Sequence, residues 1–227
     1  MKHNFQVSYL IDAPQSLVVG AYLDCEHYYY LHDNAIQHCE ILEYSPTHIR
    51  WNQVWRIFGF RIGHTLTTKY LPPATFINEK IEAFPKWLPS IHHFVKVESR
   101  SDFYHWDEQT TLSLFTVDMN MPWYVYPYRN ILKYLILRFK ILIDLEDVAM
   151  LARKTHLFGS QSVFHLLHKD QFILFKDEFS KSFGNSNKPL TPPFELQKKN
   201  YEHITKLKKS YIIKFMQTRF RELSGLR

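Results

Sequence analysis

The longest hydrophobic pattern in the chain runs from Tyr128 to Gly159 and has the period of an amphipathic helix. Apolar residues recur at helical spacing along it, including Ile136, Ile143 and Met150. Pro127 directly precedes the stretch and a glycine ends it, which are favourable residues at the two ends of a helix. The pattern predicts one long helix that buries this hydrophobic stripe.

One charged residue, Asp147, lies on the stripe. It follows Ile143 by four positions and precedes Met150 by three, so we expect it to face inward with them. Burying a carboxylate is costly unless a cation or hydrogen-bond donors meet it. The sequence therefore predicts a positively charged group opposite Asp147. Asp144 shares a different line with Lys140 and is expected to face outward.

Shorter segments, in which apolar residues alternate with polar ones, predict strands. The first is Phe5–Ile11, after which Asp12 and Pro14 open a predicted helical segment that continues to His32. The other predicted strands are 36–44, 48–58, 60–71, 75–84, 91–98 and 110–119, with a short piece at 103–106.

The order of these elements predicts an α+β fold over residues 1–159. Antiparallel strands that follow one another need a cover on one face, and the long helix is the best candidate. A curved sheet wrapped on that helix leaves a cavity between them. The histidines and tryptophans of the strand region are expected to hydrogen-bond within the sheet, pack the core or line the cavity: His64, His92, His93, His105, Trp51, Trp55, Trp87 and Trp106.

The composition is that of a folded globular protein, with 227 residues of which 45% are hydrophobic. The longest apolar run is interrupted by Lys133, Arg138 and Lys140, so no transmembrane segment is predicted. The N-terminus lacks the long apolar core of a signal peptide. Cys25 and Cys39 are the only cysteines and form no CxxC pair, so we expect a reduced, cytoplasmic protein.

The basic character of the chain belongs to its C-terminal part. Residues 194–227 hold nine Lys or Arg and three Asp or Glu, a net +6 that equals the charge of the whole chain. We expect residues 160–227 to form a helical extension, with a linker at 184–193 and an amphipathic helix at 195–223. This helix is expected to cover the body through its apolar face. Nucleic-acid binding is not favoured, because no nucleic-acid module is recognisable.

A candidate chemical motif, DxxHxxxxH, is formed by Asp24, His27 and His32. Asp24 and His27 share one face of a helix. The two histidines are about 140° apart on an ideal α-helix, so they converge only if the helix bulges or ends between them.

Residues 21–32 resemble the iron-binding segment in the catalytic domain of Rieske-type non-haem iron oxygenases. That catalytic domain is a helix-grip domain of the START superfamily, and the order of elements over residues 3–159 resembles the same fold. The third iron ligand of the family is a carboxylate on the long C-terminal helix, where this chain has Glu146-Asp147 followed by apolar residues.

The resemblance implies that His27, His32 and Asp147 hold one mononuclear non-haem Fe(II), with Glu146 as the weaker rival ligand. It also implies that Asp24 orients a ligand histidine and bridges it towards the electron donor. The family's Rieske cluster needs CxH and CxxH pairs, and no CxxH pair is present, so the cluster is not expected in this chain. Oxidation would need electrons from a separate electron-transfer protein.

Three hypotheses therefore remain open. The first is an Fe(II) protein that binds a hydrophobic or aromatic molecule between sheet and helix and oxidises it. The second is a non-catalytic carrier of a lipid or aromatic compound with the same fold. The third is an interaction protein that binds its partner through residues 185–227.

Overall fold

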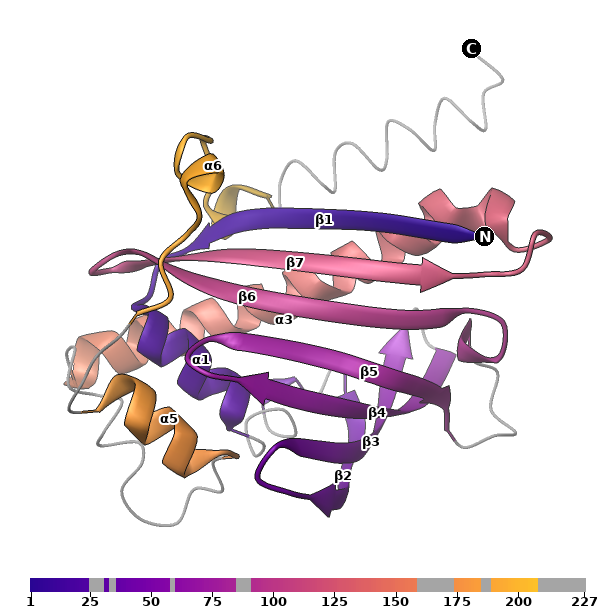
Figure 1. Cartoon of the computed structure of the whole chain (residues 1–227), viewed down its shortest axis with the longest axis horizontal. Helices are drawn as coiled ribbons and strands as arrows, with labels where there is room; N and C mark the ends of the chain where they lie inside the picture. Colours follow the sequence, from indigo (N-terminus) through magenta and orange to yellow (C-terminus); the bar gives the residue numbers. More distant parts are fainter. Residues whose placement is uncertain are drawn as a thin grey trace.

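One sheet of seven antiparallel strands forms the body of the protein, in the order β1-β7-β6-β5-β4-β3-β2 (Figure 1). The structure is a computed structural model and describes residues 1–24, 31–32, 36–57, 60–84, 91–158, 174–184 and 189–207. The strands are β1 (Lys2–Ile11), β2 (Ile36–Tyr44), β3 (His48–Ile57), β4 (Phe60–Leu71), β5 (Thr75–Ala83), β6 (Lys96–Asp107) and β7 (Thr110–Asn120). The predicted α+β architecture is confirmed, and most of the predicted strands end within a few residues of the observed ones.

The sixth strand is where the prediction of strands was wrong. Two segments were predicted, at 91–98 and 103–106, whereas the chain forms a 3-10 helix at Ile91–His93 and then the continuous strand β6. The middle of β6 reads SRSD and has no apolar residue, so the alternating pattern lapses there. The side chains that face inward in this part of β6 are Ser99 and Ser101.

The helix α3 (Arg129–Phe158) confirms the predicted long helix, and a 3-10 turn that contains Pro127 leads into it. In Figure 1, α3 lies behind the sheet, with α1 (Gln15–Leu23) near its second half. The predicted helical segment up to His32 is not one continuous helix, because α1 ends at Leu23; Leu31 is helical again, and residues 25–30 lie outside the described residues. Asp24 has extended backbone angles of φ −82° and ψ 100°.

The space between α3 and the sheet holds most of the hydrophobic core. Near the start of α3, Leu137 packs in one cluster with Val97 and Phe115. Further along, Ile141 packs in a larger cluster with Phe103 and other side chains from the sheet, from α1 and from α5 (Lys176–Phe183). Burial of this apolar surface fixes α3 against the concave face of the sheet.

The sheet curves around α3 with the help of an irregularity between β4 and β5. Thr65 pairs with Glu82 and Thr67 with Glu79, so β5 carries an extra residue at this point. Lys80 there has a positive φ of 51°. Bulges of this kind bend a strand and increase its twist.

The C-terminal segment packs on the edge of the sheet at β1, but not as the continuous helix that was predicted from residue 195. Helix α6 spans only Phe194–Gln197. The chain then extends, so that the carbonyl of Glu202 accepts a hydrogen bond from the Leu10 amide at 3.0 Å. The centroids of the Tyr201 and Trp106 rings are 5.5 Å apart, and Ile204 is fully buried. An open strand edge offers backbone groups that a helix cannot satisfy, which explains the departure.

The predicted linker at 184–193 is also attached to the body where the structure describes it. The carbonyl of Leu190 accepts hydrogen bonds from the His105 amide at 2.7 Å and from Gln15 Nε2 at 3.1 Å. Residues 185–188 and 208–227 lie outside the described residues.

Candidate ligand cavity and carboxylate cluster

A cavity of about 310 Å³ lies between the sheet and the first half of α3. Its wall is predominantly apolar, with aromatic side chains from β3 and β5 and aliphatic side chains from α3. Among the lining residues are Trp51, Phe76, Val117, Ile136, Phe139 and Ile143. The volume falls at the lower end of the range typical of small-molecule sites.

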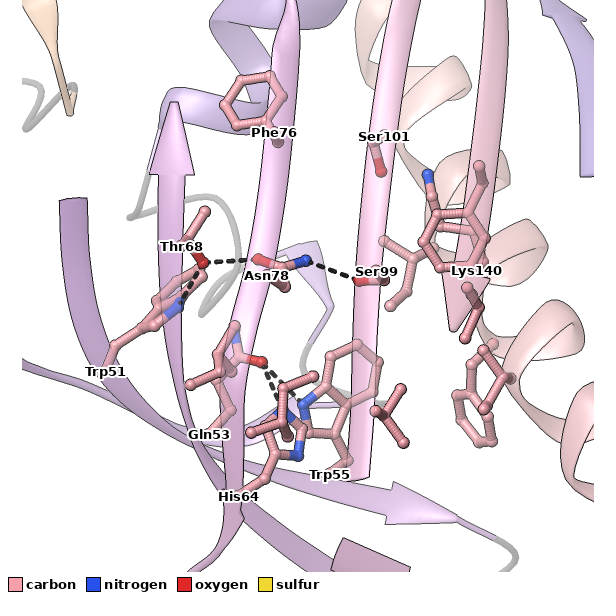
Figure 2. Close-up of a pocket in the computed structure, with 18 of the residues that line it drawn as sticks. Trp51, Gln53, Trp55, His64, Thr68, Phe76, Asn78, Ser99, Ser101 and Lys140 are labelled. Atoms are coloured by element: carbon pink, nitrogen blue, oxygen red, sulfur yellow. Dashed lines mark hydrogen bonds between the residues drawn. The ribbon is translucent and has the colours of Figure 1, made fainter. Parts of the chain in front are cut away.

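A chain of hydrogen bonds crosses the sheet on the cavity wall (Figure 2). Trp51 Nε1 donates to Thr68 Oγ1 at 3.0 Å, and Thr68 Oγ1 donates to Asn78 Oδ1 at 2.7 Å. Asn78 Nδ2 then donates to Ser99 Oγ at 3.2 Å. The register places Thr68, Asn78 and Ser99 directly opposite one another on β4, β5 and β6, so their side chains share one face.

A second polar group lies on the same wall. Gln53 Oε1 accepts hydrogen bonds from Trp55 Nε1 and from His64 Nε2, each at 3.0 Å. Burial, together with the nearby His92 ring, lowers the pKa of His64 to about 3. His64 is therefore neutral at pH 7 and carries its proton on Nε2, because Gln53 Oε1 is only an acceptor.

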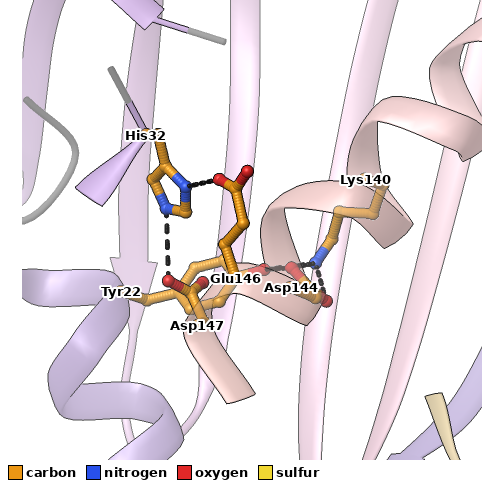
Figure 3. A network of polar contacts seen from close by, with 6 residues as sticks. All are labelled: Tyr22, His32, Lys140, Asp144, Glu146 and Asp147. Atoms are coloured by element: carbon orange, nitrogen blue, oxygen red, sulfur yellow. Dashed lines mark hydrogen bonds and ion pairs between the residues drawn. The ribbon is translucent and has the colours of Figure 1, made fainter. Parts of the chain in front are cut away.

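Asp144 lies inside the protein, so the prediction that it faces outward was wrong. Its side chain is 1% exposed and forms an ion pair with Lys140 at 2.6 Å. Tyr22 donates to Asp144 Oδ1 at 2.7 Å, and Tyr9 donates to the other carboxylate oxygen. Lys140 also donates to the Tyr22 hydroxyl (Figure 3). Burial first and the Asp144 charge second raise the pKa of Tyr9, which keeps its phenol protonated.

Asp147 is buried, with 4% exposure, which confirms its predicted inward orientation. Its Oδ1 atom lies 3.2 Å from Nε2 of the fully buried His32 (Figure 3). The other ring nitrogen of His32 lies 2.6 Å from Glu146 Oε2. Burial alone would lower the pKa of His32, but the two carboxylates outweigh it and raise the pKa. The group that meets Asp147 in the structure is therefore the His32 ring.

The structure brings His32, Asp147 and Glu146 together, while His27 lies outside the described residues. Asp24 is buried near the end of α1. Within the described part of the chain, no group of three His, Cys, Asp or Glu side chains is arranged to hold a metal ion.

The geometry at His32 is nevertheless compatible with a metal ligand pair. Two ligand atoms that are each about 2.1 Å from one ion, at a right angle, stand about 3.0 Å apart. The observed separation of 3.2 Å between His32 Nε2 and Asp147 Oδ1 is close to that value. Glu146 on the far nitrogen orients the ring in the way that carboxylates orient ligand histidines in metalloproteins.

His32, Glu146 and Asp147 form what we call the carboxylate cluster, and this cluster is separate from the cavity. None of Asp24, His32, Glu146 and Asp147 is among the described residues that line the cavity.

Sequence reasoning missed the polar residues of the cavity wall. No sequence motif marks Thr68, Asn78 or Ser99. The available signal of a polar wall was the interruption of the apolar alternation in β6. Of the predicted histidines and tryptophans, His64, His92, Trp51 and Trp55 line the cavity. His92 and His93 lie on a 3-10 helix and not on a strand, Trp106 packs against the C-terminal segment, and Trp87 lies outside the described residues.

Several solved structures are similar to this architecture, although their sequences differ strongly from this one. No family model and no curated protein matches the sequence. The structure of Zhui aromatase/cyclase from Streptomyces sp. R1128 matches with a TM-score of 0.57 at 13% identity, over 70% of this chain and 99% of that chain. The chain has the helix-grip fold.

Two further solved structures are similar to this helix-grip chain. The protein TTHA0849 from Thermus thermophilus matches with a TM-score of 0.50 at 15% identity, over 66% of this chain and 99% of that one. A START superfamily protein from Mycobacterium smegmatis has a TM-score of 0.49 at 16% identity, over 66% and 98%. At 13% and 15% identity, the first two comparisons establish the fold alone. None of the described helices is long and apolar enough to cross a bilayer.

Proposed function

We propose that this protein binds an apolar, ring-containing small molecule in the cavity between the sheet and α3, as a non-catalytic carrier. The observation that carries the proposal is the cavity itself, which is walled by aromatic and aliphatic side chains in the centre of the fold. Flat aromatic and aliphatic walls contact ring systems over a large area, and burial of that area favours binding.

The cavity exists because small residues stand where a filled core would have large ones. Ser99 and Ser101 occupy successive inward positions of β6, between Val97 and Phe103, which are both buried. An apolar occupant would bury the surface of these walls, which is favourable by about 25 cal/mol for each Å² removed from water.

The test is the binding of fluorene, a neutral tricyclic hydrocarbon, measured by equilibrium dialysis. Ile136→Trp adds bulk to a lining position on α3, whereas Ile131→Trp makes the same change at a position of α3 that is 59% exposed. We expect wild type and Ile131→Trp to bind alike, and Ile136→Trp to bind at least ten-fold more weakly. The proposal is wrong if wild type does not bind fluorene, or if both variants bind it equally.

A second candidate function is metal binding at the carboxylate cluster. We propose His32 and Asp147, together with His27, as ligands of a mononuclear Fe(II), with Glu146 orienting His32. The supporting observation is the buried His32 ring held between two carboxylates, at 2.6 Å and 3.2 Å. Fe(II) there would supply oxygen activation, and any oxidation would need electrons from a separate protein.

The metal proposal is tested by the iron content of protein reconstituted with Fe(II) without oxygen. Asp147→Asn should lose the iron, and Asp118→Asn, a change at an exposed carboxylate of β7, should keep it. Fluorene binding should be the same in both variants, because Asp147 does not line the cavity. Wild-type protein that takes up no iron would refute the metal proposal and leave the carrier proposal intact.

A further inference from the structure

The cavity wall carries a hydrogen-bond chain with a fixed direction, and this direction identifies the class of ligand. We infer that the cavity selects uncharged ring compounds with a hydrogen-bond-accepting oxygen, such as a ketone carbonyl, placed against the Ser99 hydroxyl. The inference rests on the proposed carrier function and specifies its ligand.

The direction of the chain is set at Trp51. An indole nitrogen can only donate, so the Thr68 hydroxyl accepts from Trp51, and it donates its own hydrogen to Asn78. That hydrogen goes to an oxygen, which fixes the Asn78 amide with its oxygen toward Thr68 and its NH₂ group toward Ser99. Ser99 is therefore an acceptor within the chain, and its hydroxyl hydrogen remains at the end of it.

The hydroxyl hydrogen of Ser99 has no acceptor among the described residues. Ser99 lines the cavity, so the hydrogen is available to a ligand. Each hydroxyl that both accepts and donates becomes a better donor, because the bonds of such a chain polarise one another. The chain thus presents a donor in a predominantly apolar wall, where a ligand oxygen can accept from it.

The ligand is expected to be uncharged because the cavity has no spare charge to offer. The one lysine among the described lining residues, Lys140, directs its ammonium group to both oxygens of Asp144 and to the Tyr22 hydroxyl, which uses its three hydrogens. His64 is neutral, as its lowered pKa indicates. An anionic ligand would enter an apolar site without a free counter-charge, and this is costly.

The test compares three molecules of nearly equal shape: fluorene, 9-fluorenone and fluorene-9-carboxylate. Ser99→Ala should weaken fluorenone binding by about three- to ten-fold, the range of a neutral hydrogen bond, and change fluorene binding by less than two-fold. Ser101→Ala removes the next hydroxyl on the same face of β6 and is the matched control, since no hydrogen bond from a described residue fixes its direction. It should leave both affinities unchanged. The carboxylate should bind wild type at least ten-fold more weakly than fluorene.

Each outcome separates this inference from the carrier proposal. If fluorene binds but Ser99→Ala affects fluorenone and fluorene alike, the inference about Ser99 is wrong and the carrier proposal stands. The inference is equally wrong if Ser101→Ala reproduces the loss, or if the carboxylate binds best. If none of the three molecules binds to wild-type protein with the native circular dichroism spectrum, both proposals fail.

Discussion

Replacing His64 with glutamine should remove a large part of the acid sensitivity of this protein. His64 lies on β4, its Nε2 atom donates to Gln53, and burial together with the nearby His92 ring lowers its pKa to about 3. An unfolded histidine has a pKa near 6.5. Below pH 6.5 the unfolded chain therefore binds a proton at His64 that the folded protein does not bind, so stability falls as the pH falls.

The size of the effect follows from these two pKa values. A pH of 5 is about 1.5 units below the pKa of His64 in the unfolded chain. Protonation therefore stabilises the unfolded state by about 2 kcal/mol at this pH. The folded protein gains almost nothing at that pH, because its His64 pKa of about 3 lies well below pH 5. At pH 7 the same contribution is only about 0.2 kcal/mol. His64 should thus account for a loss of about 2 kcal/mol between pH 7 and pH 5.

The measurement is the free energy of unfolding by urea at pH 7 and pH 5, for wild type and His64→Gln. The variant should lose about 2 kcal/mol less than wild type between the two pH values, although His92, whose pKa is lowered to about 4, still contributes in both proteins. His38→Gln, which removes a half-exposed histidine of β2, is the control for the loss of a histidine elsewhere in the sheet. Equal losses in wild type and His64→Gln would show that folded His64 takes up a proton, and the cavity would then not be neutral.

Three other predictions concern stability, each measured by urea unfolding at pH 7. Lys140→Met should destabilise the protein by about 3–5 kcal/mol, because it leaves Asp144 buried without its cation, and Lys140→Met/Asp144→Leu should recover most of that loss. Tyr9→Phe should cost about 1.5–3 kcal/mol through loss of a hydrogen bond to the same charged carboxylate, and no change would contradict the buried contact. Ile204→Ala should cost about 2–5 kcal/mol if the C-terminal segment is part of the same core, whereas a segment that packs loosely would tolerate the change.

The long helix and the orientation of Asp147 could be predicted because both depend on local periodicity. A carboxylate at the right spacing between Ile143 and Met150 must follow the stripe inward, whatever meets it there. The identity of its partner was not local. The sequence indicated only that a cation or hydrogen-bond donors were needed, and the fold supplies the His32 ring, which contacts α3 from a segment more than one hundred residues away.

Asp144 shows why the same reasoning failed one turn earlier. Its neighbour at i−4 is Lys140, and such pairs are common on exposed helix faces, which made the outward orientation the natural interpretation. The pair is instead buried, because hydroxyl groups from β1 and α1 complete its hydrogen bonds. Neither tyrosine is near Asp144 in the sequence, so no periodic pattern could have revealed the cluster.

The cavity was predicted as a consequence of the fold, but its polar wall was not, because that wall is assembled across strands. Thr68, Asn78 and Ser99 become neighbours only through the register of β4, β5 and β6. Each by itself is an ordinary strand residue. Their combination matters because the donor-only nitrogen of Trp51 starts a chain in which Thr68 and then Asn78 donate in the same direction, toward Ser99.

The two halves of α3 therefore contribute to two separate candidate sites. The first half of α3, up to Ile143, lines the cavity, where Lys140 is paired with Asp144 and the wall favours an uncharged ligand. Asp144 and Asp147 follow these residues and are both buried. Lys140 pairs with Asp144, and His32 lies against Asp147. A substrate-oxidising centre requires its metal ligands to border the substrate, and His32 and Asp147 do not line the described cavity. The proposed ligand binding thus does not depend on the metal, whereas an oxidation would also require a path from this cavity to the carboxylate cluster.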